Sequence, residues 1–369
     1  MSYSLKIFIV LIFLFAPGCK DTSVEPDDGF FSEYDSRDFR LGFTSWAYAL
    51  TVQSVDSTYD FIKEYADVYA EHFDYRIPWK AWINNGPLPA EFTNNIAGKL
   101  ARRLAREKFL LSVSLFNTER NNLALDYDGT RPGYYHLNDK KIEDAYFKHV
   151  TYLIEQFSPD YLVIVIEANL LRDNAPEKWE DYKLLAANVT RRVRALYPAL
   201  PIAESMSLNS MYDAVLAEKT SEVDSIFDYM NNMDFDAISF YPFMRNLHTK
   251  EEVQKVFNFL HKNAKKKIAF VETSTIAENL SIPALNIYIN GNETEQNDYL
   301  ETLLINAQRH NYEFIIWWAH RDFDDLWEIF PDEVKDIGKI WRDTGILDEN
   351  NKTRKAFYTW NLVYRKKYK

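Results

Sequence analysis

Two glutamates stand at the ends of short apolar segments, about a hundred residues apart. Glu167 follows the aliphatic run Leu162–Ile166, and Glu272 closes the segment Lys267–Glu272, which reads KIAFVE. Such runs are typical of strands buried on both faces, as in a parallel sheet. A carboxylate at the end of such a strand does not serve packing, because burying an unpaired charge is costly. Glu167 and Glu272 are therefore the candidate catalytic residues, and they can share acid–base and nucleophilic work if their environments separate their pKa values. The alternative for each is a structural carboxylate at a strand end, as in an ion pair with an arginine.

The apolar pattern from Phe39 onward alternates between short strands and longer helices, which predicts an α/β fold with a single (β/α)8 TIM barrel. A doubly wound open sheet is the alternative, but no Gly-x-Gly-x-x-Gly follows any predicted strand. The strands are expected at Arg40–Trp46, Tyr69–Trp79, Phe109–Phe116, Tyr161–Glu167, Pro201–Ser205, Ala237–Tyr241, Ile268–Thr273 and Phe314–Trp318.

Several helices show directly in the sequence. Thr249-x-x-Glu252 has the pattern of a capping box at a helix start. Apolar faces at helical spacing are formed by Val253, Val256, Phe257 and Leu260, by Trp179, Tyr182, Ala186, Val189 and Val193, and by Leu300, Leu303, Leu304 and Ala307. Two long segments, Asn117–Asp139 and Ser274–Asn297, follow the third and seventh strands. Both are expected at the C-terminal mouth of the barrel, where active sites of this fold are built.

The N-terminus predicts a lipoprotein signal peptide at residues 1–18. Lys6 precedes the apolar run Ile7–Phe15, which is too short to span a bilayer about 30 Å thick. The following Ala-Pro-Gly-Cys resembles the bacterial lipobox, which implies cleavage before Cys19 and lipidation of this cysteine, the only one in the chain. The alternative for Cys19 is an ordinary buried thiol. Residues 19–38 are polar and acidic and are expected to form a flexible tether, which leaves residues 39–369 for the barrel.

Composition and missing motifs exclude several functions. The net charge is −12, and removing residues 1–18 with their one lysine gives −12 − 1 = −13. Such a surface repels phosphate backbones, so we expect no nucleic-acid partner. The histidines lack His-x-His or His-x-x-x-His spacing, and Gly-x-Ser-x-Gly and Gly-Lys-Ser/Thr are absent, so no catalytic metal and no cofactor is expected. Aromatic residues make up 16% of the chain, which gives weak support to a carbohydrate ligand.

The order of the strand-end motifs resembles the clan A glycoside hydrolases, and within them the endo-β-1,4-galactanase-like group and its uncharacterised bacterial lipoprotein relatives. The resemblance runs from Phe39 to about Tyr364. It implies a retaining hydrolase of a β-linked plant-type polysaccharide, such as galactan or arabinogalactan, with Glu167 as acid/base and Glu272 as nucleophile. With the lipobox, it implies a protein anchored in the membrane of a Gram-negative cell envelope. The motifs are GFTSW (42–46), YRIPW (75–79), VIEAN (165–169), SFYPF (239–243), FVETS (270–274), IIWWAHRD (315–322) and TGILDENNKTRKAFYTW (344–360).

The resemblance also implies roles for residues at the other strand ends. Arg76 is expected to lie against Glu272 and keep it ionised, and Tyr241 to donate its hydroxyl to the same carboxylate. Trp318 is the expected stacking floor for the sugar at the cleavage point. Each has a structural alternative: an ion pair for Arg76, and core packing for Tyr241 and Trp318. Trp46 and Trp79 are expected either as walls of sugar subsites or as packing residues.

One position departs from the pattern of the clan, which has asparagine immediately before the acid/base glutamate. This chain has Ile166 there, and Asn169 is the nearest asparagine that could contact the sugar in its place. Two other interpretations therefore stay open. The first is a carbohydrate-binding lipoprotein that kept the barrel and lost catalysis. The second is a barrel glycosidase acting on mannan, glucan or xylan.

Overall fold

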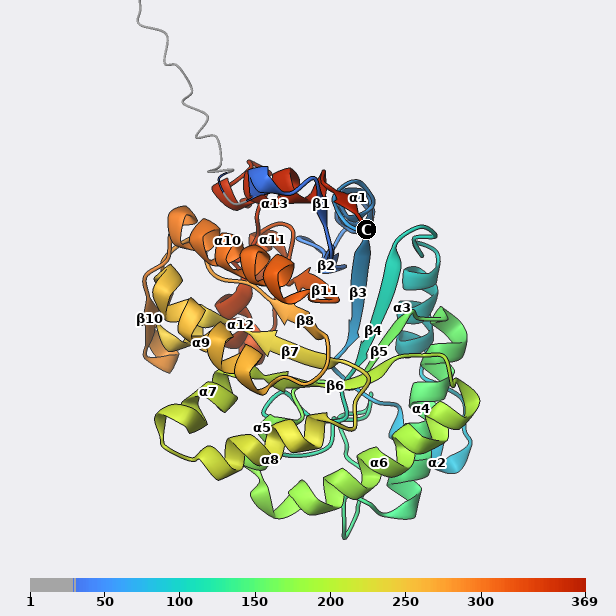
Figure 1. Cartoon of the computed structure of the whole chain (residues 1–369). Helices are drawn as coiled ribbons and strands as arrows, with labels where there is room; N and C mark the ends of the chain where they lie inside the picture. Colours follow the sequence, from blue (N-terminus) through green and yellow to red (C-terminus); the bar gives the residue numbers. More distant parts are fainter. Residues whose placement is uncertain (1–28, 30) are drawn as a thin grey trace, which may run out of the picture.

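The computed structural model describes residue 29 and residues 31–369, so the predicted signal peptide and Cys19 lie outside the described residues. Eight parallel strands close into a barrel, which confirms the predicted (β/α)8 fold (Figure 1). No helix among the described residues is long and apolar enough to cross a bilayer. In order along the chain, the barrel strands are β2 (Arg40–Thr44), β3 (Val68–Phe73), β4 (Lys108–Val113), β5 (Tyr161–Val165), β6 (Ile202–Ser207), β7 (Asp236–Phe240), β8 (Ile268–Thr273) and β11 (Phe314–Trp317).

Helices connect consecutive strands and cover the outside of the barrel (Figure 1). They are α1 (Val52–Tyr65), α2 (Trp79–Asn84), α3 (Ala90–Leu100), α4 (Lys140–Phe157), α5 (Asn169–Asn174), α6 (Trp179–Leu196), α7 (Leu208–Leu216), α8 (Thr220–Met230), α9 (Lys250–Asn263), α10 (Glu293–His310), α11 (Asp324–Glu328), α12 (Asp332–Gly338) and α13 (Lys355–Tyr364). Short 3-10 turns are η1 (Phe31–Glu33), η2 (Pro176–Lys178), η3 (Pro242–Arg245), η4 (Pro283–Leu285) and η5 (Lys339–Trp341).

The predicted helix signals are confirmed. At the start of α9 the Thr249 hydroxyl accepts the Glu252 N–H at 3.2 Å, and the Glu252 carboxylate accepts the Thr249 N–H at 3.0 Å. The apolar faces predicted for α6, α9 and α10 are all buried against the barrel. Their burial stabilises the helices, because packing of an amphipathic face contributes more to helix stability in a protein than the intrinsic helix propensity of the residues.

The two long segments after β4 and β8 lie where they were predicted, but they differ in content. Asn117–Asp139 is an irregular loop before α4. The segment after β8 instead contains a small hairpin of β9 (Leu280–Ile282) and β10 (Ile287–Ile289). Helix α10 begins at Glu293, earlier than expected, because the Asn292 side chain accepts the first free N–H groups of the helix.

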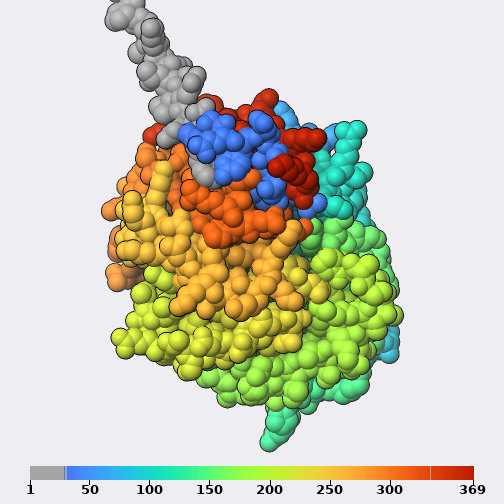
Figure 2. Space-filling model, in the orientation of Figure 1, coloured from blue at the N-terminus to red at the C-terminus, as the bar shows by residue number. Residues whose placement is uncertain are grey.

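The N-terminal segment from Phe31 onward belongs to the fold, so the tether predicted to reach residue 38 ends earlier. Phe31 is buried, and β1 (Ser36–Arg37) pairs with β12 (Lys367–Tyr368) at the end of the chain. The buried Arg37 donates to the carbonyl of Phe39 and to Asp67, each at 2.7 Å. Figure 2 shows these N-terminal residues in blue beside the C-terminal residues in dark red. The chain thus enters the barrel at the N-terminal ends of the strands.

Gly42 marks a close approach between β2 and β3. A Cβ atom at this position would lie 1.9 Å from the carbonyl oxygen of Val68. We expect Gly42→Ala to lower the free energy of unfolding by about 3 kcal/mol, because the backbone of a closed barrel cannot move aside without strain. Urea denaturation measures this loss. The control is Gly98→Ala in α3, where a Cβ meets no atom within 4 Å and no loss is expected. Equal stability of the two variants would contradict the prediction.

Candidate active site

The two glutamates lie next to each other at the C-terminal mouth of the barrel. Glu272 is in β8, in register with Ser239 of the neighbouring β7. The Ser239 hydroxyl donates to Glu167 Oε1 at 2.9 Å. Since adjacent strands lie about 4.8 Å apart, Ser239 brings the carboxyl groups of Glu167 and Glu272 into the same small region.

An irregular strand end orients Glu167. The register of β5 against β6 shifts between Val163 and Val165, and β5 ends there, two residues earlier than predicted. Ile166 packs into the apolar interior of the barrel. Glu167 then adopts a left-handed backbone conformation with φ 51°, and its N–H donates to the Ser205 hydroxyl at 2.8 Å. A non-glycine residue in this conformation costs roughly 1–2 kcal/mol, and such strain concentrates at functional sites.

Glu272 is the more enclosed of the two carboxyl groups. The Tyr241 hydroxyl donates to Glu272 Oε1, as predicted, and His72 Nε2 lies 3.6 Å from Oε2. Burial, followed by the charge of Glu167, raises the pKa of Glu272 to about 8, while the Tyr241 hydrogen bond opposes this rise. Burial also lowers the pKa of His72 to about 4, so this histidine is neutral beside the carboxyl group at neutral pH. The surroundings therefore favour a protonated Glu272 before substrate binds, contrary to the expectation that it is kept ionised.

Arg76 does not lie against Glu272, and that prediction is wrong. Its guanidinium donates to the carbonyl oxygens of Asp126 at 3.2 Å and Tyr127 at 2.8 Å, and it stacks on the Tyr75 ring at 4.8 Å. The reason is that β3 ends at Phe73, so Arg76 lies three residues beyond the strand, on the loop.

Arg120, which sequence reasoning missed, supplies the positive charge at the glutamate pair. Its Nη2 lies 3.6 Å from Glu167 Oε2, and its two terminal nitrogens donate to Asp74 at 2.8 and 2.6 Å. Burial opposes the charge of Arg120, but Asp74, Glu167 and Glu272 outweigh it, and the pKa of Arg120 is raised. Its only sequence signal was its place in the long loop Asn117–Asp139.

Two further predicted binding residues serve the fold instead. Asn169 is fully buried; its side chain accepts the Ser207 N–H at 2.8 Å and donates to the Ser207 carbonyl at 3.1 Å. Both sides of its amide are thereby occupied, so it cannot replace the asparagine missing before Glu167. Trp79 is 1% exposed at the start of α2, and its indole N–H donates to the Ala124 carbonyl at 2.8 Å. It belongs to the core and is no wall of the site.

Trp46 and Trp318 form an aromatic wall beside His72, the histidine that neighbours Glu272. Their ring centroids are 5.3 Å apart, and Trp318 lies 5.6 Å from the ring of His72. Trp341, which was not predicted, approaches Tyr241 from the segment after β11, with centroids 6.0 Å apart. The indole N–H groups of Trp46, Trp318 and Trp341 have no hydrogen-bond partner among the described residues. These nitrogen atoms are themselves buried.

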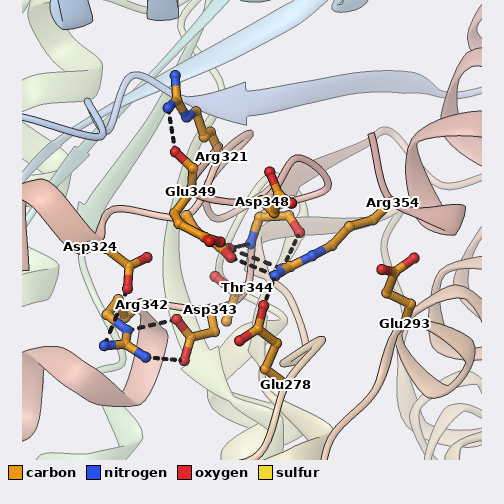
Figure 3. Close-up of polar contacts among 12 residues, drawn as sticks. Glu278, Glu293, Arg321, Asp324, Arg342, Asp343, Thr344, Asp348, Glu349 and Arg354 are labelled. Carbon is orange, nitrogen blue, oxygen red and sulfur yellow. Dashed lines mark hydrogen bonds and ion pairs between the residues drawn. The ribbon is translucent and has the colours of Figure 1, made fainter. Parts of the chain in front are cut away.

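A cluster of carboxylates lies near the mouth, around the buried Asp322. Within it, Glu278 and Glu349 on one side and Asp324 and Asp343 on the other come close enough to Asp322 to share an ion. Arginines already pair with four of these five carboxylates: Arg354 pairs with Asp322 and Glu278, and Arg342 with Asp343 and Asp324. Figure 3 shows Arg342 between Asp343 and Asp324, and Arg354 beside Glu278. The arrangement is an ion-pair network, and we assign it no metal.

The raised pKa of Glu272 predicts a pH-dependent stability. In the unfolded chain Glu272 loses its proton near pH 4.5, where a glutamate side chain ordinarily titrates, whereas in the folded protein it keeps the proton up to about pH 8. The protonated Glu272 therefore contributes its full stability below pH 4.5, and this contribution is lost as the pH rises to about 8. In Glu272→Gln the glutamine side chain has no proton to lose over this pH range. We expect the gain of this variant in Tm over the wild type to grow between pH 5 and pH 8, to about 2 °C or more, and then to level off. Differential scanning calorimetry across pH measures the gain, with exposed Glu180→Gln as the control. A gain that does not vary with pH would contradict the prediction.

Comparisons with known proteins give structural neighbours only. No protein-family profile matches the chain, and no curated protein matches it in sequence. Among solved structures, a GH53 catalytic domain of Ignisphaera aggregans is 15% identical with a TM-score of 0.58, over 89% of this chain and 97% of that one. An exo-β-1,4-mannosidase of an Opitutaceae bacterium is 11% identical with a TM-score of 0.60, over 89% and 60%. An endo-1,4-β-xylanase of Penicillium canescens is 10% identical with a TM-score of 0.58, over 92% and 97%.

At these identities the neighbours establish the shared barrel fold and leave the reaction open. Their names describe a GH53 domain, a mannosidase and a xylanase, and so span several sugar classes. The fold is thus common to enzymes of different specificity, and any function for this chain must be argued from its own residues.

Proposed function

We propose that the protein is a retaining glycoside hydrolase that cleaves a β-linked polysaccharide, with galactan or arabinogalactan as the first substrates to test. The observation that carries this proposal is the pairing of Glu167 and Glu272 through Ser239 at the mouth of the barrel, with Tyr241 on Glu272. The fold shared with glycoside hydrolases supports it.

In the proposed reaction Glu167 gives its proton to the glycosidic oxygen while Glu272 attacks the anomeric carbon from the opposite face. In the second step Glu167 takes a proton from a water molecule while the water oxygen attacks the anomeric carbon. The bond between this carbon and Glu272 breaks, and the sugar leaves with overall retention of configuration. Tyr241, already bonded to Glu272 Oε1, holds this carboxylate in position for the attack. The strained backbone at Glu167 fixes the direction of the proton donor.

The aromatic wall supports a sugar as the substrate. The ring of Trp318 beside His72 offers an apolar face on which a pyranose can stack. Stacking on an aromatic ring suits a sugar, because a pyranose is apolar on its faces and polar at its edges.

A reducing-sugar assay tests the proposal on the chain lacking residues 1–19. It covers galactan, arabinogalactan, mannan, glucan and xylan, with Glu167→Ala and Glu272→Ala in parallel. Release from one polymer that both substitutions abolish would support the hydrolase and identify the substrate. Release from mannan, glucan or xylan alone would favour the other barrel glycosidases.

A carbohydrate-binding protein without catalysis is the second candidate. Ile166 in place of the expected asparagine favours it, and so does the buried Arg120 at 3.6 Å from the proposed proton donor. No sugar release from any polymer, combined with retarded migration in gels that contain one of them, would support this candidate.

We further propose that Cys19 carries a lipid that anchors the protein in a Gram-negative cell envelope; the lipobox-like Ala-Pro-Gly-Cys supports this. Cys19→Ser is expected to move the protein from the membrane fraction to the soluble fraction after expression in a Gram-negative host. Mass spectrometry of the wild-type N-terminal peptide should show an acylated Cys19. An unmodified peptide that still contains residues 1–18 would overturn the proposal.

A further inference from the structure

Arg120 is the buried cation next to the two glutamates. Among the residues that the structure describes, no other arginine or lysine has a nitrogen within 4.0 Å of a carboxylate oxygen of Glu167 or Glu272. Arg120 is 5% exposed, so its charge acts through a poorly solvated space. At 3.6 Å from Glu167 it is too far for a good hydrogen bond, and its effect on this carboxylate is electrostatic.

The surroundings of Arg120 hold its guanidinium in one place. Asp74, just beyond the end of β3, takes both terminal nitrogens in a fork, which is the most directional arrangement for an arginine. Nη1 also donates to the Asn117 carbonyl at 3.2 Å and to the Ser114 hydroxyl at 3.3 Å. The backbone of Arg120 is left-handed, with φ 49°, and the turn closes where Asn117 Oδ1 accepts two N–H groups further along the loop.

The two glutamates meet unequal surroundings. Glu167 has the fixed cation and the Ser239 hydroxyl, which both stabilise a carboxylate. Glu272 has the Tyr241 hydroxyl but only a neutral imidazole, His72, where a cation was expected. The charged or titratable groups that act on this space are Asp74, Arg120, Glu167, His72, Tyr241 and Glu272.

We propose that Arg120, fixed by Asp74, is a positioning residue that keeps the negative charge of the pair on Glu167 before substrate binds, so that the proton of the pair resides on Glu272. The inference rests on the proposed function for its meaning in catalysis. The reaction needs the opposite distribution, with the proton on Glu167. Substrate binding must therefore be accompanied by the transfer of one proton from a Glu272 oxygen to a Glu167 oxygen, which leaves Glu272 as the carboxylate that attacks and changes no other group.

The first test does not require activity. Carbon-13 labelling of the glutamate side chains allows NMR to follow each carboxyl group through a pH titration, with Glu167→Gln and Glu272→Gln used to assign the two signals. In the wild type we expect Glu167 to lose its proton first and Glu272 last, at pH values more than about 1 unit apart. Loss of the proton from Glu272 first, or from both together, would overturn the proposal. Arg120→Lys, which keeps the charge, should preserve the order.

The second test is kinetic. The first proton lost from the pair sets the acid limb of kcat/KM, and the proposal assigns this proton to Glu167. Without the cation Glu167 holds its proton to higher pH, so Arg120→Gln should move the acid limb upward by about 1 to 3 pH units. Arg120→Lys should restore most of the wild-type profile. The matched control is Arg172→Gln, which removes a positive charge in α5 whose contacts are with Glu222. A general loss of activity with an unmoved limb would mean that Arg120 is merely structural.

The two tests separate this inference from the proposed function. A wild type that cleaves none of the polymers refutes the hydrolase, while the NMR titration still decides where the proton lies. If Arg120→Gln does not fold, the wild type and Arg120→Lys still complete the titration. A wild type that cleaves a polymer but has its proton on Glu167 keeps the hydrolase and refutes the role of Arg120.

Discussion

Glu272→Ala is expected to lower kcat for the polymer that the wild type cleaves by at least about 10⁴-fold, because the substitution removes the proposed nucleophile. Glu167→Ala should be less severe, since general acid–base catalysis contributes about 10²–10⁴-fold. Its loss should also depend on the leaving group, and be smallest for activated aryl glycosides that need no proton.

Sodium azide distinguishes the two roles further. In Glu272→Ala the small anion fits the space of the lost side chain and attacks the anomeric carbon directly, which gives a glycosyl azide of inverted configuration. In Glu167→Ala azide attacks the covalent intermediate and gives the retained configuration. NMR spectra of the products show the configuration at the anomeric carbon. Glu204→Gln is the matched control, because Glu204 is a buried glutamate of β6 that bonds to Tyr182 and Tyr229. Full activity of Glu272→Ala, or the reverse pairing of products, would overturn the assignment.

Arg354→Met is expected to lower the free energy of unfolding by about 3–5 kcal/mol, because it leaves the buried carboxylate of Asp322 without its counter-ion. The side chains of Arg354 and Asp322 are 3% and 1% exposed, and their closest oxygen–nitrogen distance is 2.6 Å. Burial raises the pKa of Asp322 and Arg354 opposes the rise, so loss of the arginine also favours protonation. Arg354 further donates to the Gly345 carbonyl at 3.2 Å and thus joins the segment after β11 to the start of α13.

Urea denaturation measures this loss. Adding Asp322→Asn to Arg354→Met should recover part of it, since the unpaired charge is then gone. The control is Lys183→Met in the exposed Lys183–Glu180 pair of α6, where a change within about 0.5 kcal/mol is expected. A loss at Arg354 as small as that at Lys183 would show that the network in Figure 3 contributes little to stability.

The barrel could be predicted from the sequence because each inner strand is a short apolar run between polar segments. The starts of the predicted strands lie within one residue of those observed, as for Tyr161 and Ile268. The ends were less predictable. The sequence predicts a second strand that reaches Trp79, because Tyr75–Trp79 continues the aromatic and apolar pattern. In the structure the chain leaves the sheet after Phe73, and Trp79 begins a helix.

The site was predictable where it lies on a strand or within two residues of a strand end, as for Glu272 in β8 and Glu167 after β5. Glu272 and Tyr241 follow the period of the sheet, and the structure brings them together. Arg120 comes from an irregular loop, and only the tertiary fork with Asp74 places it at Glu167. The prediction that Asn169 contacts the sugar is wrong because it assumed that the strand continues past Glu167. The chain instead turns at Glu167 and starts a helix.

The pairing of β1 with β12 places the point where the N-terminal segment joins the barrel. The chain reaches the barrel beside Arg37 and Tyr368, at the pole opposite to the mouth that carries Glu167 and Glu272. In a molecule tethered through Cys19, as proposed, the tether would therefore join the barrel at the pole away from the mouth and leave the mouth uncovered. Long glycans could then reach the mouth without passing the tether.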